Sequence, residues 1–242
     1  ADSMHIDETA GAGVLVGKPR VEGKAGRPYT LVGTRIEMGL SRREIRLVKA
    51  LGKGEATGDD WRLTADTIHL AIERRQLQQA FAWGDSSRPH AVSSRYTIQA
   101  DSLALDVPDE VLTEARAFGR AFSTTARDSA AAAPDLDWIA GDTLTAHFVQ
   151  EADSAGEPGP RLRQLVARGS ARAFTHLYDE RDPSALPSLN YSRGTRIAVA
   201  LNGERIDRVL VSGQADGLHL EALPPAPAAP AAPDTTRGSS PS

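Results

Sequence analysis

The chain has 242 residues, a formal net charge of −4 and 25% charged residues, which leaves room for one large β domain or two small ones. This charge balance argues against a dedicated nucleic-acid-binding protein, which normally carries a basic face. The absence of cysteine excludes disulfides and thiolate metal sites. No apolar run approaches the roughly 20 residues that a membrane-spanning helix needs. Because the sequence starts at Ala1 rather than at methionine, we expect that a secretion signal or an N-terminal anchor has been removed.

A strand-like half-unit recurs along the chain. It begins with an aromatic residue, alternates apolar and polar residues, passes through a small residue followed by Asp or Thr, and ends on aliphatic residues. Copies lie at 29–38, 61–70, 96–105, 138–144 and 191–199, with a shortened copy at 1–6. In 138–144 and 191–199 the aromatic residue lies one position closer to the small residue. Alternation of this kind is typical of β-strands.

A second half-unit follows each copy and ends at a glycine, with apolar or small residues seven, four and two positions before it. The glycines that show this spacing are Gly52, Gly84, Gly119, Gly169 and Gly213. Gly17 fits less well, because Val14 and Val16 have the other parity. Turn signals at Asn202-Gly203 and Pro108-Asp109 separate the two halves. Each unit therefore predicts two strands and two turns.

The alternation slips once in each strand, at sites such as Ala65-Asp66-Thr67. A slip reverses the face to which side chains point, and a bulge or sharp bend at the slip restores one apolar inner side. Stacked bent hairpins of this kind predict two antiparallel sheets folded like a V. A parallel β-helix is the alternative, but the hairpin turns favour the antiparallel arrangement.

Three internal segments rich in Pro, Gly, Ala or charge are predicted loops: 127–134, 153–160 and 179–187. The segment 224–242 consists mostly of Pro, Ala, Ser, Thr and Gly, and we expect it to be a disordered tail. The repeats then form one domain over 1–223. Within it, 1–17 and 208–220 are the expected sheet edges, which invite strand addition unless Pro19, Pro28 and the tail cap them.

The small-Asp-Ser/Thr-aliphatic strand, the Ala-x-Gly ending of its partner and the unit length resemble the LptA/OstA-like (organic solvent tolerance-like) family of periplasmic lipopolysaccharide transport. The resemblance covers roughly 1–223 and is strongest at 96–121, 138–146 and 191–220. It implies a V-shaped β-jellyroll that shelters the acyl chains of lipopolysaccharide and joins LptC-like and LptD-like modules edge to edge. The three predicted loops and the tail are longer than such a bridge requires.

The predicted inner positions define a candidate lipid-binding groove. Its residues are Ile36, Met38, Ile68, Leu70, Ala80, Ala82, Leu103, Leu105, Ala115, Ala117, Leu144, Ala167 and Val199. Rows of aliphatic residues beside rows of alanine would leave a channel that acyl chains fill, with about 0.8 kcal/mol for each buried methylene. The alternative is a solid core, because alanine also lets two sheets approach closely.

Neither a catalytic nor a metal site is predicted. The six histidines lack the spacing of zinc ligands, and no nucleophile lies near a base in a recognisable motif. We therefore expect a non-enzymatic periplasmic protein without a cofactor, which carries lipopolysaccharide or a related amphipathic lipid for outer-membrane assembly. A structural or adhesive repeat scaffold with a filled core is the alternative. A carbohydrate-active β-helix enzyme is a third hypothesis, and it requires an acidic cluster on one exposed face.

Overall fold

The computed structural model describes residues 3–7, 9–24, 27–42, 44–125, 136–152, 158–178, 186–203 and 205–221. Nearly all of this is strand, and the only helical element in these ranges is one 3₁₀ turn, η1 (Pro108–Glu110). The all-β prediction is confirmed. Among the same residues no helix is long and apolar enough to cross a membrane. The predicted tail 224–242 and most of the three predicted loops lie outside the described residues, but 158–160 are strand rather than loop.

The described residues form seventeen strands. The first nine are β1 (Ser3–Asp7), β2 (Ala12–Val16), β3 (Arg20–Gly23), β4 (Tyr29–Val32), β5 (Arg35–Ser41), β6 (Glu44–Thr57), β7 (Trp61–Glu73), β8 (Gln76–Trp83) and β9 (His90–Ser93). The others are β10 (Tyr96–Gln99), β11 (Ser102–Asp106), β12 (Glu114–Thr125), β13 (Trp138–Ala152), β14 (Pro158–Leu177), β15 (Ser188–Asn202), β16 (Arg205–Ser212) and β17 (Asp216–Leu220).

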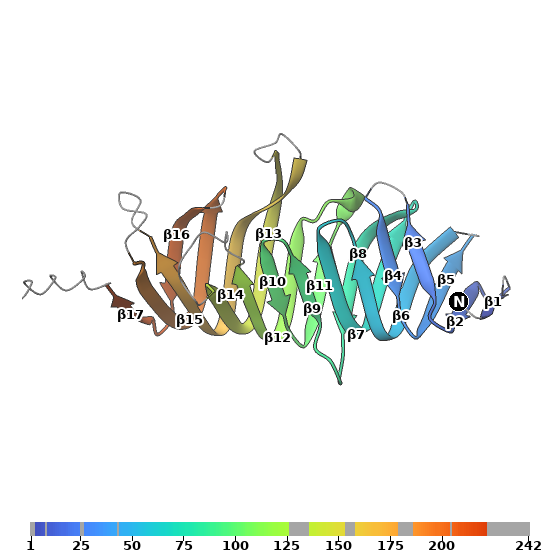
Figure 1. Ribbon diagram of the computed structural model, residues 1–242, viewed down its shortest axis with the longest axis horizontal. Coiled ribbons are helices and arrows are strands. Elements are labelled where there is room, and N and C mark those ends of the chain that lie inside the picture. The colour runs from blue at the N-terminus through green and yellow to red at the C-terminus, as the bar shows by residue number, and fades with distance from the viewer. Residues whose placement is uncertain are drawn as a thin grey trace, which may run out of the picture.

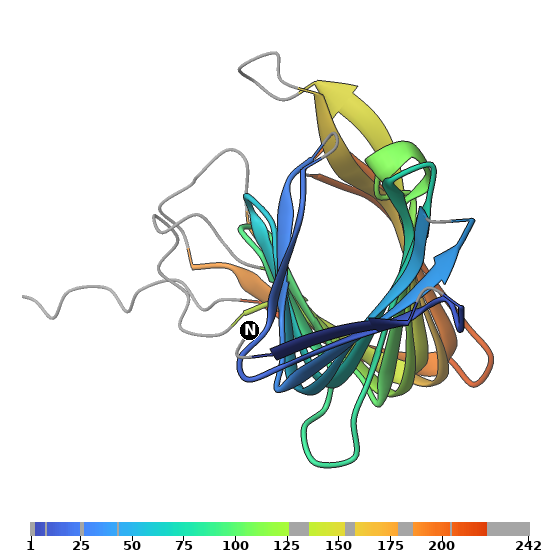
Figure 2. The same cartoon turned by 90° about the vertical axis from the view of Figure 1, so that its right-hand side faces the viewer.

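The strands form two walls that share their long, bent strands. Wall A has the order β1-β2-β5-β6-β7-β8-β11-β12-β13-β14-β15-β16. Wall B has the order β3-β4-β6-β7-β9-β10-β12-β13-β14-β15-β17. Figure 1 shows the strands stacked along the long axis, and Figure 2 shows the walls joined along one side. Every pairing is antiparallel, which confirms the predicted roll of bent hairpins.

A β-bulge forms the corner in three returning strands, β6, β12 and β14. In β6, three residue steps from Leu51 to Gly54 stand opposite two steps from Thr67 to Ala65, and the extra residue bends the strand. At these bulges, and in the breaks between β2 and β3 and between β16 and β17, a glycine and the next residue have positive φ. These pairs are Gly17-Lys18, Gly52-Lys53, Gly119-Arg120, Gly169-Ser170 and Gly213-Gln214. The predicted slips are therefore confirmed as corners, except that Gly84 begins a loop instead.

Gly17 is a regular member of this series, contrary to the sequence-based reading. The residue two positions before it is Leu15, which is buried and belongs to the hydrophobic core. Val14 and Val16 lie on the opposite face, as the alternation of a strand requires. Because Val14 and Val16 have the other parity, the agreement of Leu15 with the repeat was not recognised from the sequence.

The Asp or Thr of one strand lies directly over the corner glycine of the next. The Thr34 hydroxyl donates to the carbonyl of Gly52 at 2.9 Å, and the Thr195 hydroxyl donates to that of Gly213 at 3.0 Å. At the corner between β8 and β9, where Gly84 begins a loop, Asp66 accepts the amides of Ser86 and Ser87. These polar side chains bond backbone groups that the bend removes from the ladder, as expected from the sequence.

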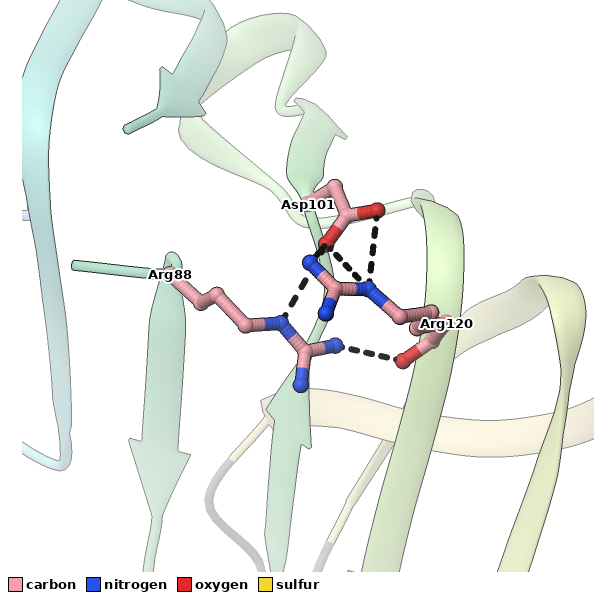
Figure 3. Close-up of polar contacts among 3 residues, drawn as sticks. All are labelled: Arg88, Asp101 and Arg120. Carbon is pink, nitrogen blue, oxygen red and sulfur yellow. Dashed lines mark hydrogen bonds and ion pairs between the residues drawn. The ribbon is translucent and has the colours of Figure 1, made fainter. Parts of the chain in front are cut away.

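The corner at Asp101 carries an additional ion network, shown in Figure 3. Arg120 Nη2 lies 2.7 Å from Asp101 Oδ1, and Arg88 Nε lies 3.3 Å from the same oxygen. Arg88 also donates to the backbone carbonyl of Arg120. The hydrogen bond from Arg120 is the main reason why the pKa of Asp101 lies below its usual range. The network joins the loop after β8 to the corner of β12.

A second bulge lies nearer the hairpin turns and explains the odd spacing between the minus-seven and minus-four positions. The register shifts between Ala71 and Ile72 of β7 and between Ala200 and Leu201 of β15. The additional residues on the returning strands are Arg46, Gln78, Arg163 and Asp207. Both limbs of each strand thus direct their apolar residues to the inside.

The predicted hairpin turns are present with altered details. Gly203 adopts φ 63°, while Asn202 still pairs with Arg205, so the turn begins one residue later than expected. Pro108 and Asp109 enter the 3₁₀ turn η1, in which Asp109 has φ 52°.

Candidate functional site

All thirteen predicted groove residues lie on the inner face of wall A. They form parts of two cross-strand rows. The row nearest the corners runs Leu15, Ile36, Ala50, Ile68, Ala82, Leu103, Ala117, Leu144, Ala167, Ile197, Val211. The middle row runs Met38, Val48, Leu70, Ala80, Leu105, Ala115, Ala146, Leu165, Val199, Val209. The structure therefore brings the predicted set together on one continuous surface.

These residues differ in how far they are exposed. Ten of the thirteen are buried, and only Met38, Leu105 and Val199 are half-buried. Near the corners, aliphatic residues alternate with alanine along the row, and the two walls fill the space between them. A role of the ten buried residues in lipid binding stays a prediction. The surface that solvent reaches lies farther from the corners.

A third inner row lies at the mouth, the side opposite the corners where the hairpin turns lie. It contains Ile45, Ile72, Leu77, Phe148, Leu162, Leu201 and Ile206. Ile45 is 40% exposed and Ile206 is 45% exposed. Sequence reasoning did not assign these residues to the groove, although the minus-seven position of the repeat marks four of them, Ile45, Leu77, Leu162 and Ile206.

The inner face of wall B differs between its two halves. Tyr29, Trp61 and Tyr96 point inward in the N-terminal half, where they pack against the hydrophobic clusters. Trp138 and Tyr191 point outward, because Ile139 and Gly194 take the inner positions of their strands. The one-residue shift of these two aromatics in the sequence thus moves them from the inside to the outside.

The outward aromatic residues form a ladder on the outer face of wall B. The ring centroids of Trp138 and Phe174 are 6.3 Å apart, as are those of Trp138 and Tyr191, and Phe122 lies 5.9 Å from Trp138. Such cross-strand pairs stabilise a sheet. Beside the ladder, His176 Nδ1 lies 2.7 Å from Asp137 Oδ1. This ladder stiffens the wall from outside and takes no part in lining the interior.

One contact joins the two walls across the mouth in the N-terminal half. The backbone amide of Arg27, in the turn between β3 and β4, donates to Glu110 Oε2 of η1 at 3.0 Å. Glu110 is only 9% exposed and has φ 63°. Burial, and then the charge of Glu110, raise the pKa of Tyr29 beside it. Figures 1 and 2 both show η1 close to the tip of β3 and β4. We call this contact the clasp.

Replacing Glu110 with alanine should release the clasp. We expect the free energy of unfolding to fall by about 1–3 kcal/mol, as for other lost hydrogen bonds to a charged acceptor. Hydrogen exchange at the Arg27 amide should also become faster. Glu110→Gln keeps a carbonyl oxygen in place and serves as the control, with a smaller effect. Unchanged exchange at Arg27 in Glu110→Ala would show that the clasp does not hold the turn.

Both ends of the roll expose sheet edges and apolar side chains. Among the described residues, β1 pairs only with β2, and β16 pairs only with β15. Met4 on β1 is 59% exposed, while Val209 on β16 and Leu218 on β17 are 42% and 55% exposed. Unpaired strand edges with apolar residues are suited to strand addition.

No group of three or more His, Cys, Asp or Glu side chains that could hold a metal ion occurs among the described residues. Three acidic residues, Asp66, Asp101 and Asp142, instead lie over glycines at the corners.

Comparison with known proteins gives one similarity of fold. No known family profile and no curated protein matches the chain. Among solved structures, the chain is similar to LptH of Pseudomonas aeruginosa, described as the LptA-homologous periplasmic component of the lipopolysaccharide transport device. The two chains are 16% identical, with a TM-score of 0.40 over 57% of this chain and 90% of that chain. A similarity of this size does not assign a ligand or a partner to the chain studied.

Proposed function

We propose that the protein carries an amphipathic lipid of the lipopolysaccharide kind along the inner face of wall A, without catalysing a reaction. One observation carries this proposal: two apolar rows run without interruption across wall A, and further apolar residues at the mouth, some of them exposed, extend this surface outward. An acyl chain laid along these rows buries its methylenes, each worth about 0.8 kcal/mol. The strand motif that resembles the LptA/OstA-like family supports the same ligand.

The proposed setting is the periplasm, where such a lipid travels to the outer membrane. The edges at β1 and β16 would add strands of similar modules, LptC-like at one end and LptD-like at the other. Exposed inner residues at both ends, including Met4 and Val209, would then continue the apolar surface into the neighbouring module. Energy for transport comes from elsewhere, since the sequence holds no nucleotide-binding motif.

Adjacent residues of β14 provide the test. Leu165 points inward, Gln164 points outward, and both are half-buried. We expect a photoreactive amino acid at 165, but not at 164, to cross-link to lipopolysaccharide supplied to the purified full-length chain. Equal cross-linking from both positions, or none from either, would contradict the proposal.

A structural scaffold with a filled core is the second candidate, and it has its own supporting observation. Ten predicted groove residues are buried by the protein's own atoms, as expected if alanine lets the walls close on each other. A scaffold should give no cross-link at either position of β14, so the same experiment separates the two functions.

A further inference from the structure

We propose that the outer face of wall A, where β14, β15 and β16 lie side by side, docks onto an anionic phospholipid membrane. These strands are at one end of the roll in Figure 1. The proposal goes beyond lipid carriage, because this face points away from the apolar interior. It rests on the charge of the three strands and on the arrangement of their outward side chains.

The three strands are basic in a chain whose net charge is −4. β14 carries four arginines, while β15 and β16 carry two each. The only acidic residue in these strands is Asp207, which is the additional residue of the β16 bulge. Positive charge is therefore concentrated in one part of the molecule, and such a concentration attracts an anionic partner.

The outward side chains of these strands form a regular grid on wall A. Its three cross-strand rows are Gln164-Ala200-Arg208, Val166-Ala198-Leu210 and Arg168-Arg196-Ser212. They point outward because the alternate residues, such as Leu165 and Ala167, pack in the hydrophobic core. The basic face is defined as four residues of this grid: Arg168, Arg196, Arg208 and Leu210.

Arg168 and Arg196 are direct cross-strand partners. Like charges that lie directly opposite each other destabilise a sheet, so the stability of the wall does not explain this pair. Within the described part of the chain neither arginine forms an ion pair, and the same holds for Arg208. These residues therefore have no counter-ion there and can accept one from a partner.

A second arginine pair, beyond the corner on wall B, shows how the chain neutralises the same arrangement. Arg172 and Arg193 are direct partners, and Asp216 of β17 lies 2.6 Å from Arg193 Nη2. On wall A, β16 places Ser212 beside Arg196. A hydroxyl can donate a hydrogen bond to a phosphate oxygen, but it carries no charge. The edge strand of wall A thus provides a hydroxyl where the edge strand of wall B provides a carboxylate.

The apolar centre of the basic face favours a membrane over a soluble anion. Leu210 is 52% exposed and lies two residues from Arg208 on the same strand. Arginine binds phosphate groups, while an exposed apolar side chain enters the boundary between headgroups and acyl chains. The small residues Ala198 and Ala200 between the strands let the three arginines reach one surface. A single phosphate ion would leave Leu210 in water.

Sedimentation with vesicles tests the proposal on the delipidated full-length chain. The unsubstituted chain should bind vesicles of mixed phosphatidylglycerol and phosphatidylcholine, and it should not bind vesicles of phosphatidylcholine alone. Each arginine near an anionic surface contributes a factor of about five in affinity, so Arg168→Gln/Arg196→Gln should weaken binding by about tenfold or more.

The matched control is Arg35→Gln/Arg62→Gln, which removes the same charge from outer faces in the N-terminal half. Both of these arginines form ion pairs with acidic residues, so the control should bind within about twofold of the unsubstituted chain. Leu210→Ala should weaken binding by about threefold, because less apolar area enters the membrane. Equal losses in the two double variants would show that net charge alone matters and would overturn the basic face.

Other results would also overturn the membrane as the partner. One is failure of the unsubstituted chain to bind the anionic vesicles. Another is a double variant Arg168→Gln/Arg196→Gln that loses binding to polyglutamate but keeps binding to vesicles, which would identify an acidic protein as the partner.

This proposal and the proposed function can fail separately. The cross-link from position 165 to lipopolysaccharide reports on the inner face, so it should persist in Arg168→Gln/Arg196→Gln. Loss of both the cross-link and vesicle binding in this variant, with unchanged urea denaturation, would show that the arginines act on the carried lipid. That result would overturn membrane docking and leave lipid carriage in place.

Discussion

Replacing Gly119 with alanine should lower the free energy of unfolding by about 2–4 kcal/mol, because two costs combine at this corner. Gly119 has φ 75°, a conformation that disfavours any residue with a Cβ. An added Cβ would also overlap the carboxylate of Asp101, which the ion network holds in place. Chemical denaturation of the purified variant measures the loss.

Gly203 supplies the control for this prediction. It has φ 63°, but nothing lies within 4 Å of an added Cβ. Gly203→Ala should therefore show only the conformational cost, about 1 kcal/mol. In the double variant Gly119→Ala/Asp101→Ala the overlap with the carboxylate disappears and only the Cβ of residue 101 stays close, at 2.9 Å. The double variant should therefore lose less stability than the sum of the two single changes. Additive losses of unfolding free energy would show that the Asp101 side chain is not a reason why position 119 needs glycine.

Replacing Leu144 with alanine should cost about 3–4 kcal/mol, in the upper part of the range for buried leucine. Leu144 is fully buried in the row nearest the corners, and its neighbours in that row are Ala117 and Ala167. Neither alanine is large enough to extend into the space that the leucine leaves. The cavity therefore persists, and its cost adds to the loss of buried apolar area.

Leu210 is the control for the core substitution. It lies on β16 and is 52% exposed, so Leu210→Ala should change the free energy of unfolding by less than about 0.5 kcal/mol. Both variants can be compared by urea denaturation followed through tryptophan fluorescence. A similar loss in the two variants would indicate that the inner row near the corners is not closely packed.

The sequence predicted the corners well, because their signals are local. A glycine, its Asp or Thr partner one strand away and the slip in alternation all recur within about thirty residues, so five repeats reinforced one another. The same repeats placed all thirteen groove residues on one face of wall A. The sequence did not identify Gly17 as a corner glycine, because the match was judged on Val14 and Val16 and not on the buried Leu15 between them.

Other features depend on how distant segments meet, and local patterns do not contain that information. Nothing near Arg27 or Glu110 in the chain indicates the clasp, which joins residues 83 positions apart. The alternation also does not say whether the walls lie close enough to bury Ile68 or Ala82. The shifted aromatics at Trp138 and Tyr191 were visible, but their outward direction needed the register of the neighbouring strands.

The two halves of the interior suggest how one fold combines stability with binding. The N-terminal half is closed by inward rings and by the clasp. In the C-terminal half of wall B, Trp138, Phe174 and Tyr191 point outward and stiffen the wall from the solvent side. Rigidity in that half then does not require a filled interior.

Native mass spectrometry of the full-length protein, released gently from the compartment in which it is made, shows whether a lipid occupies the interior. We expect a population with one or more acylated lipids bound, which disappears on delipidation and returns when lipopolysaccharide is added. A chain that has the ligand-free mass under all of these conditions, and that remains folded, would contradict it.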